Sequence, residues 1–74
     1  MTVEQIGELH RARQAARAVA KAATDIADFL DRASAVPDPA QLVEFATLLA
    51  REESDQAKRN DACAAAGLEA PSIE

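Results

Sequence analysis

The segment VPDPAQ, residues 36–41, decides the fold of this chain of 74 residues. Pro37 ends any helix that precedes it, because the residue before a proline avoids the α region of backbone space. Asp38 is a good N-cap residue, and Pro39 suits the first position of a new helix. A connection this short between two long helices predicts an antiparallel hairpin.

Long helices are predicted on both sides of this turn, at about residues 3–34 and 39–66. Both stretches are rich in alanine, arginine, leucine and glutamate, which are strong helix formers. The predicted hairpin domain covers residues 1–67. Residues 68–74 contain a proline and are expected to form an irregular tail.

The first predicted helix carries an apolar row along one side. It begins with a capping box, in which Thr2 caps the helix and Gln5 reaches back. Apolar residues then recur at alternating steps of three and four, the spacing of a coiled-coil seam. Several of them are alanines, which let a neighbouring helix approach closely. The row consists of Leu9, Ala12, Ala16, Val19, Ala23, Ile26, Leu30 and Ala33.

The apolar side chains are too small for one hairpin to have a strong core. Hydrophobic residues make up 49% of the chain, but 19 of its residues are alanine, which buries little area. Disulfides and metal clusters are excluded, since Cys63 is the only cysteine and His10 the only histidine. Small chains with thin cores need a partner instead. We therefore expect an all-α fold, an antiparallel two-helix hairpin that self-associates into a helical bundle as a homo-oligomer. The expected contacts between copies are Ile6, Leu9, Phe29, Leu42, Phe45 and Leu49.

Several function classes are disfavoured. We expect no enzyme, because the chain has no Ser/His/Asp or Cys/His arrangement and no glycine-rich phosphate loop. No metal site and no cofactor are expected. The net charge of −5 disfavours binding to a nucleic-acid duplex. No apolar run approaches the ~20 residues of a membrane span. A lone cysteine and the lack of a signal-peptide pattern favour a cytoplasmic setting.

In the predicted hairpin, a row of basic residues on the first helix lies opposite a polar stretch on the second. The row holds one histidine and three bases at steps of three, four and four, which places them on one face. The polar stretch is REESDQAKRND, residues 51–61. Two interpretations stay open. Either acids of this stretch pair with the bases across the hairpin, or the two together line a groove for an anionic ligand or a protein partner. The candidate binding residues are His10, Arg13, Arg17, Lys21, Glu52 and Glu53.

Three segments resemble a known group of phage proteins. They are ARAVAKAATDIADFL (16–30), VPDPAQ (36–41) and LAREESDQAKRN (49–60). In these segments the chain resembles the helical-hairpin cyclic-nucleotide sponges that block host anti-phage signalling, of the anti-CBASS type. The resemblance implies a hairpin that assembles into oligomers and sequesters cyclic oligonucleotides at subunit interfaces without hydrolysing them. At residues 54–56 the chain has Ser-Asp-Gln, where the family tends to carry apolar and aromatic residues.

Two functions follow as expectations. The first is a non-enzymatic binding protein that acts by stoichiometric inhibition or sequestration, as a phage counter-defence protein that binds an anionic ligand such as a cyclic nucleotide. The alternative is a structural interaction module, or an accessory subunit, that binds a larger protein through its apolar helix faces.

Overall fold

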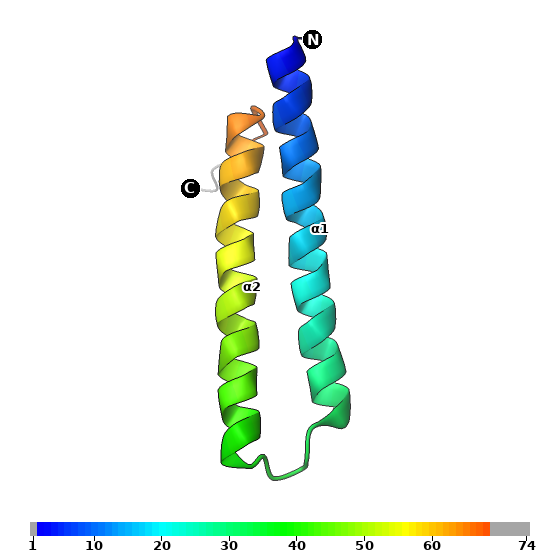
Figure 1. Ribbon diagram of the computed structural model, residues 1–74, viewed down its shortest axis with the longest axis vertical. Coiled ribbons are helices and arrows are strands. Elements are labelled where there is room, and N and C mark those ends of the chain that lie inside the picture. Colours follow the sequence, from blue (N-terminus) through cyan, green and yellow to red (C-terminus); the bar gives the residue numbers. More distant parts are fainter. Residues whose placement is uncertain (1, 69–74) are drawn as a thin grey trace, which may run out of the picture.

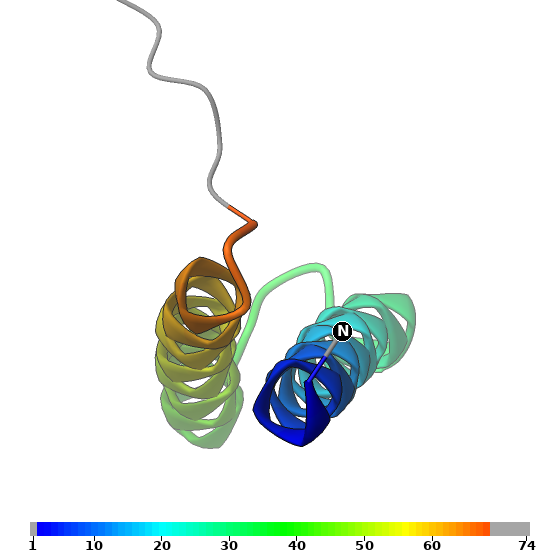
Figure 2. The ribbon, with the colours of Figure 1, turned by 90° about the horizontal axis from the view of Figure 1, so that it is seen from above.

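A computed structural model of the chain describes residues 2–68 and consists of two long helices. Helix α1 spans Val3–Arg32 and helix α2 spans Pro39–Ala65 (Figure 1). They run antiparallel and lie side by side, as the two views in Figures 1 and 2 agree. The prediction of an all-α helical hairpin is therefore confirmed. Of the predicted tail, residues 69–74 lie outside the described residues.

Both helices begin with a capping box. At α1, the Gln5 backbone N–H donates to Thr2 Oγ1 at 3.2 Å, and the Thr2 N–H donates to Gln5 Oε1 at 2.8 Å. At α2, the Gln41 N–H donates to Asp38 Oδ1 at 2.8 Å, and the Asp38 N–H donates to Gln41 Oε1 at 3.2 Å. Each box satisfies two backbone donors that a helix start leaves without a partner. The second box fixes where the chain turns back.

Helix α2 ends at a glycine with a left-handed backbone. Gly67 has a φ of 81°, a conformation that other residues rarely adopt. The Leu68 N–H donates to the Cys63 carbonyl at 2.8 Å, and the Gly67 N–H donates to the Ala64 carbonyl at 3.0 Å. These bonds satisfy carbonyl groups of the last turn in the pattern of a Schellman motif.

The core between the helices is thin. Among residues 2–68, the buried side chains are Ala12, Ala22, Phe29 and Ala62. Phe29 is the one large member, and its ring stacks on that of Phe45 with centroids 5.6 Å apart. The Arg32 guanidinium lies over the Phe29 ring at 5.2 Å, within cation–π range. The largest apolar contact of the hairpin therefore lies near the turn.

The predicted seam on α1 was wrong at three of its eight positions. Ala16, Ala23 and Leu30 are exposed, and the residue before each of them faces α2 instead. Two parallel apolar rows run along α1, and both have steps of three and four. The hairpin uses the row that contains Phe29, because this aromatic side chain buries more area than Leu30 does. The residues that face α2 in place of the predicted three are Ala15, Ala22 and Phe29.

Replacing Phe29 with alanine is expected to remove most of the stability of the hairpin. Truncating a buried phenylalanine typically lowers the free energy of unfolding by about 3–5 kcal/mol, which is a large fraction of what a small domain has. Urea unfolding followed by far-UV circular dichroism measures the loss. Val43→Ala is the control, because Val43 is 68% exposed on α2 and its loss changes stability by about 0.5 kcal/mol or less. Equal losses in the two variants would contradict the central place of Phe29.

Candidate functional site

The basic row lies on the outside of the hairpin. His10, Arg13, Arg17 and Lys21 are all exposed. One residue turns an α-helix by about 100°, so Arg17 points about 200° away from Ala15, which faces α2. The row therefore points away from α2 and does not form one side of a groove with it. The sequence placed these residues on one face of α1 but could not show which way that face points.

The ion pairs across the hairpin differ from those considered in the sequence. Arg51 Nη2 on α2 lies 3.2 Å from Asp25 Oδ2 on α1, and Arg32 forms a bidentate pair with Glu44. Within residues 2–68, no ion pair joins Arg13, Arg17 or Lys21 to the acids of the polar stretch. The structure therefore contradicts the first interpretation, in which acids of the polar stretch pair with these bases, because the basic row faces away from α2.

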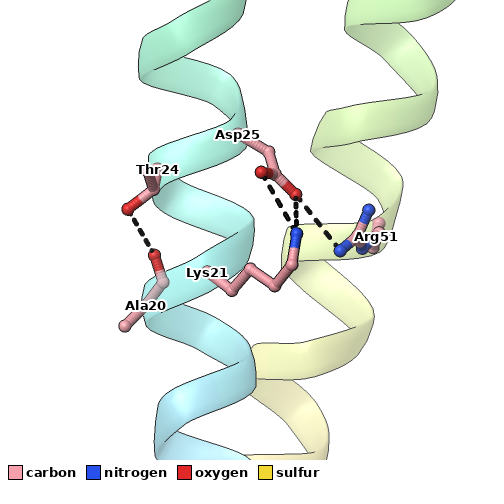
Figure 3. A network of polar contacts seen from close by, with 5 residues as sticks. All are labelled: Ala20, Lys21, Thr24, Asp25 and Arg51. Carbon is pink, nitrogen blue, oxygen red and sulfur yellow. Dashed lines mark hydrogen bonds and ion pairs between the residues drawn. The ribbon is translucent and has the colours of Figure 1, made fainter.

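Asp25 is shared by one base from each helix. Lys21 Nζ, one turn earlier on α1, donates to its two carboxylate oxygens at 3.3 and 3.0 Å. Figure 3 shows Lys21 and Arg51 reaching the same carboxylate from the two helices. The hydrogen bond from Lys21 lowers the pKa of Asp25, desolvation opposes this, and the charges of Lys21 and Arg51 lower the pKa further. Lys21, a member of the basic row, is therefore already paired within the hairpin.

The two candidate glutamates lie on different sides of α2. Glu52 is half-buried and falls on the face of α2 that is turned toward α1, whereas Glu53 is exposed. Neither takes part in an ion pair within the described residues. The basic row and this glutamate pair are therefore not brought together within one chain.

A groove does run between the helices, beside the predicted site. Its volume is about 510 Å³. Small side chains leave this space open, because Ala15 and Ala18 of α1 and Ala62 and Ala65 of α2 line it. Sequence reasoning missed it, although alanines at facing positions were the signal. Two bases and two acids converge on the groove, so it has no net preference for an anion. The lining residues are Arg11, Gln14, Ala15, Ala18, Asp55, Lys58, Asp61, Ala62 and Ala65.

The opposite long side of the hairpin is apolar. Each residue on this side comes directly after a residue that faces the other helix, as Ala16 follows Ala15 and Leu42 follows Gln41. Its side chain is therefore turned by about 100° from the inward direction. The groove residue Gln14 precedes Ala15 and is turned by the same angle to the other side. Leu49 is half-buried and the other members are exposed. We call this surface the apolar edge; it comprises Ala16, Ala20, Ala23, Ala27 and Leu30 of α1 and Leu42, Ala46 and Leu49 of α2.

The residues predicted to join copies fall into three groups. Phe29 and Phe45 stack on each other within the hairpin, and Phe29 is only 4% exposed, so it offers no free surface. Leu9 and Leu49 are half-buried. Ile6 and Leu42 are 54% and 58% exposed.

Residues 2–68 contain no cluster of three or more His, Cys, Asp or Glu that could hold a metal ion. Neither described helix is long and apolar enough to cross a membrane.

Acid is expected to weaken the hairpin through its ion pairs. The pKa of Asp25 is lowered by Lys21, and that of Glu44 is lowered by the hydrogen bond from Arg32. A lowered pKa gives stability that is present above the unfolded-state values, about 3.9 for Asp and 4.3 for Glu, and is lost as the pH falls through the folded-state values. Asp25→Asn should therefore melt lower at neutral pH and lose less on acidification, in thermal melts across a pH series. Glu53→Gln is the control for the change of charge, because it also removes one exposed carboxylate but breaks neither of these ion pairs.

No protein-family model, curated protein or solved structure matches the chain. Its function is therefore inferred from its own residues and their geometry.

Proposed function

We propose that this protein is a non-enzymatic interaction module that acts by stoichiometric contact through its apolar edge, as a structural or accessory subunit or as an inhibitor. The apolar edge is the observation that carries this proposal. It covers the parts of both helices that lie near the turn, and the hairpin itself leaves Leu30 and Leu42 each 58% exposed. Contiguous apolar surface of this kind on a small protein marks a site of contact with another molecule.

The thin core supports the same proposal. Only one large side chain is buried among the described residues, so the hairpin gains little by folding alone. Fully burying a Leu or Ile side chain is worth about 1.5–3 kcal/mol relative to leaving it exposed. Covering Leu30 and Leu42 of the apolar edge, which are each 58% exposed, therefore adds a stabilising free energy of several times RT per copy. A partner on the apolar edge stabilises the fold at the same time as it is bound.

The edge has a shape suited to a helix. Its α1 part consists of alanines followed by Leu30, so the backbone of a partner helix can approach to the short end of the usual 8–10 Å interaxial distance. Its α2 part adds Leu42 and Leu49 near the turn. The free thiol of Cys63, the only cysteine of the chain, suits the reducing conditions of the cytoplasm.

A photo-reactive amino acid placed on the edge is expected to capture the bound partner. At Leu42 it should form a discrete covalent adduct in living cells, with the mass of a stoichiometric complex and an identity given by mass spectrometry. At Val43 the same probe is 68% exposed but turned away from the edge, so adducts there should be rare. An adduct to this chain itself and an adduct to another protein both agree with an interaction module. Equal labelling at the two positions, or none at either, would rule the apolar edge out.

A second candidate function rests on the basic row. Arg13 and Arg17 are exposed and form no ion pair within residues 2–68. Segment 10–21 of α1 contains no acid at all. Exposed guanidinium groups at helical spacing bind phosphate or carboxylate oxygens well. In this candidate the protein sequesters an anionic ligand such as a cyclic nucleotide and acts in phage counter-defence, as the sponge resemblance implies.

The anion candidate predicts that one class of ligand raises the melting temperature. A ligand that binds only the folded state adds about 2.7 kcal/mol at 100 times its Kd, which raises the melt of so small a domain by roughly 10 °C or more. A panel of anions that includes cyclic dinucleotides is the measurement. Arg17→Glu should abolish the shift. Arg11→Glu makes the same charge change on the groove side of α1 and should preserve it. A panel without any shift would eliminate this candidate.

A further inference from the structure

We infer that the partner on the apolar edge is a second copy of this chain, with α1 packed antiparallel on α1 of that copy. This inference rests on the proposed function, since it names the occupant of the same surface. Two observations carry it: the apolar row on the free side of α1 continues along most of the helix, and the charges beside this row are basic at Arg13 and Arg17 but acidic at Asp28 and Asp31.

The free side of α1 has the spacing of a complete second seam. Starting at Ile6, the steps are three and four in strict alternation up to Leu30, which is the pattern that two packed helices share. Leu9 is half-buried and all other members are exposed. Arg13 is the only polar member. The row consists of Ile6, Leu9, Arg13, Ala16, Ala20, Ala23, Ala27 and Leu30.

This row finds its best match in its own copy. The corresponding edge of α2 is apolar only near the turn, at Leu42, Ala46 and Leu49, and continues as Glu53 and Gln56. A partner's α2 would therefore place polar side chains on the alanines of α1. A partner's α1 places apolar residues along the row from Ala16 to Leu30. When the two-fold axis crosses the row between Ala20 and Ala23, Ala20 lies opposite the partner's Ala23.

The charges select the antiparallel direction. In segment 10–21 the charges beside the row are the bases Arg13 and Arg17, and in segment 25–31 they are the acids Asp28 and Asp31. Arg11 lies on the groove side, and Asp25 is paired within the hairpin. An antiparallel pair sets segment 10–21 of each copy beside segment 25–31 of the other, so that opposite charges meet twice. A parallel pair sets the two basic segments side by side and the two acidic segments side by side, which is unfavourable.

The arrangement also gives the exposed arginines a partner. Arg13 and Arg17 lie along the border of the row and reach the level of the partner's Asp28 and the partner's Asp31. Asp28 and Asp31 are themselves exposed and make no ion pair within residues 2–68, unlike Asp25. These four charged side chains, which have no ion pair within residues 2–68, are thus paired by the second copy.

A charge-swap experiment tests the inference in the full chain. The first variant carries Arg13→Glu and Arg17→Glu, and the second carries Asp28→Lys and Asp31→Lys. Each variant alone brings like charges together in the antiparallel pair and should raise the dimer dissociation constant about tenfold or more. An equimolar mixture of the two should form a heterodimer, because both contacts are attractive again. A chain with all four changes keeps the net charge of −5 and should dimerise as the original does. Sedimentation equilibrium gives the masses, and circular dichroism shows that the helices persist.

The outcomes separate this inference from the proposed function. Loss of the dimer in each variant and its return in the mixture and in the fourfold variant establishes the antiparallel pair. No return in the mixture overturns it, and rescue of the first variant by Glu53→Arg would place α1 on α2 of the other copy instead. A monomeric original chain that still forms a Leu42 adduct with a different protein overturns the second copy and leaves the interaction module standing. A monomeric original chain that forms no Leu42 adduct overturns both the second copy as partner and the interaction module.

Discussion

The stacked pair of Phe29 and Phe45 is the contact on which the rest of the hairpin depends. Phe29 is the one large side chain that is fully buried among residues 2–68, and the other buried positions there are alanines. Because small side chains contribute little area, the end of the hairpin away from the turn is held by weak contacts. Ion pairs at Asp25 and Arg32 lie in the same half of α1 and fix how the helices align. Stability is therefore concentrated near the turn.

The local features of the fold were predictable from the sequence, whereas the rotation of each helix was not. Pro37, Asp38 and Pro39 act on their own neighbours, so the turn and the start of α2 can be predicted from a few residues. The seam on α1 was predicted one residue off at Ala16, Ala23 and Leu30, because both rows have the same spacing. The direction of the basic row follows from that rotation, which is why the sequence left open whether Arg17 pairs across the hairpin. Within residues 2–68 it forms no such pair.

The two long sides of the hairpin differ in the contacts that they make. The polar side carries the ion pairs of Asp25 and Arg32 and the open groove, all of which act within one chain. On the apolar side, the contacts within the chain do not explain why Leu30 and Leu42 remain exposed. A division of this kind separates folding from association: one side sets the register of the two helices, and the other side is left for a partner.

The two neighbouring apolar rows of α1 also have an evolutionary consequence. Alanine stands in both rows at successive positions, so these positions hardly distinguish the inside of the hairpin from its outside. At the other positions the inner row is the bulkier one, because it holds Val19, Ile26 and Phe29. Exchanging the sizes of these three residues with those of the neighbours that follow them would favour a helix rotated by one residue, with the former contact surface inside and the former core exposed. A few substitutions on one helix are therefore enough to move a lineage from one surface to the other.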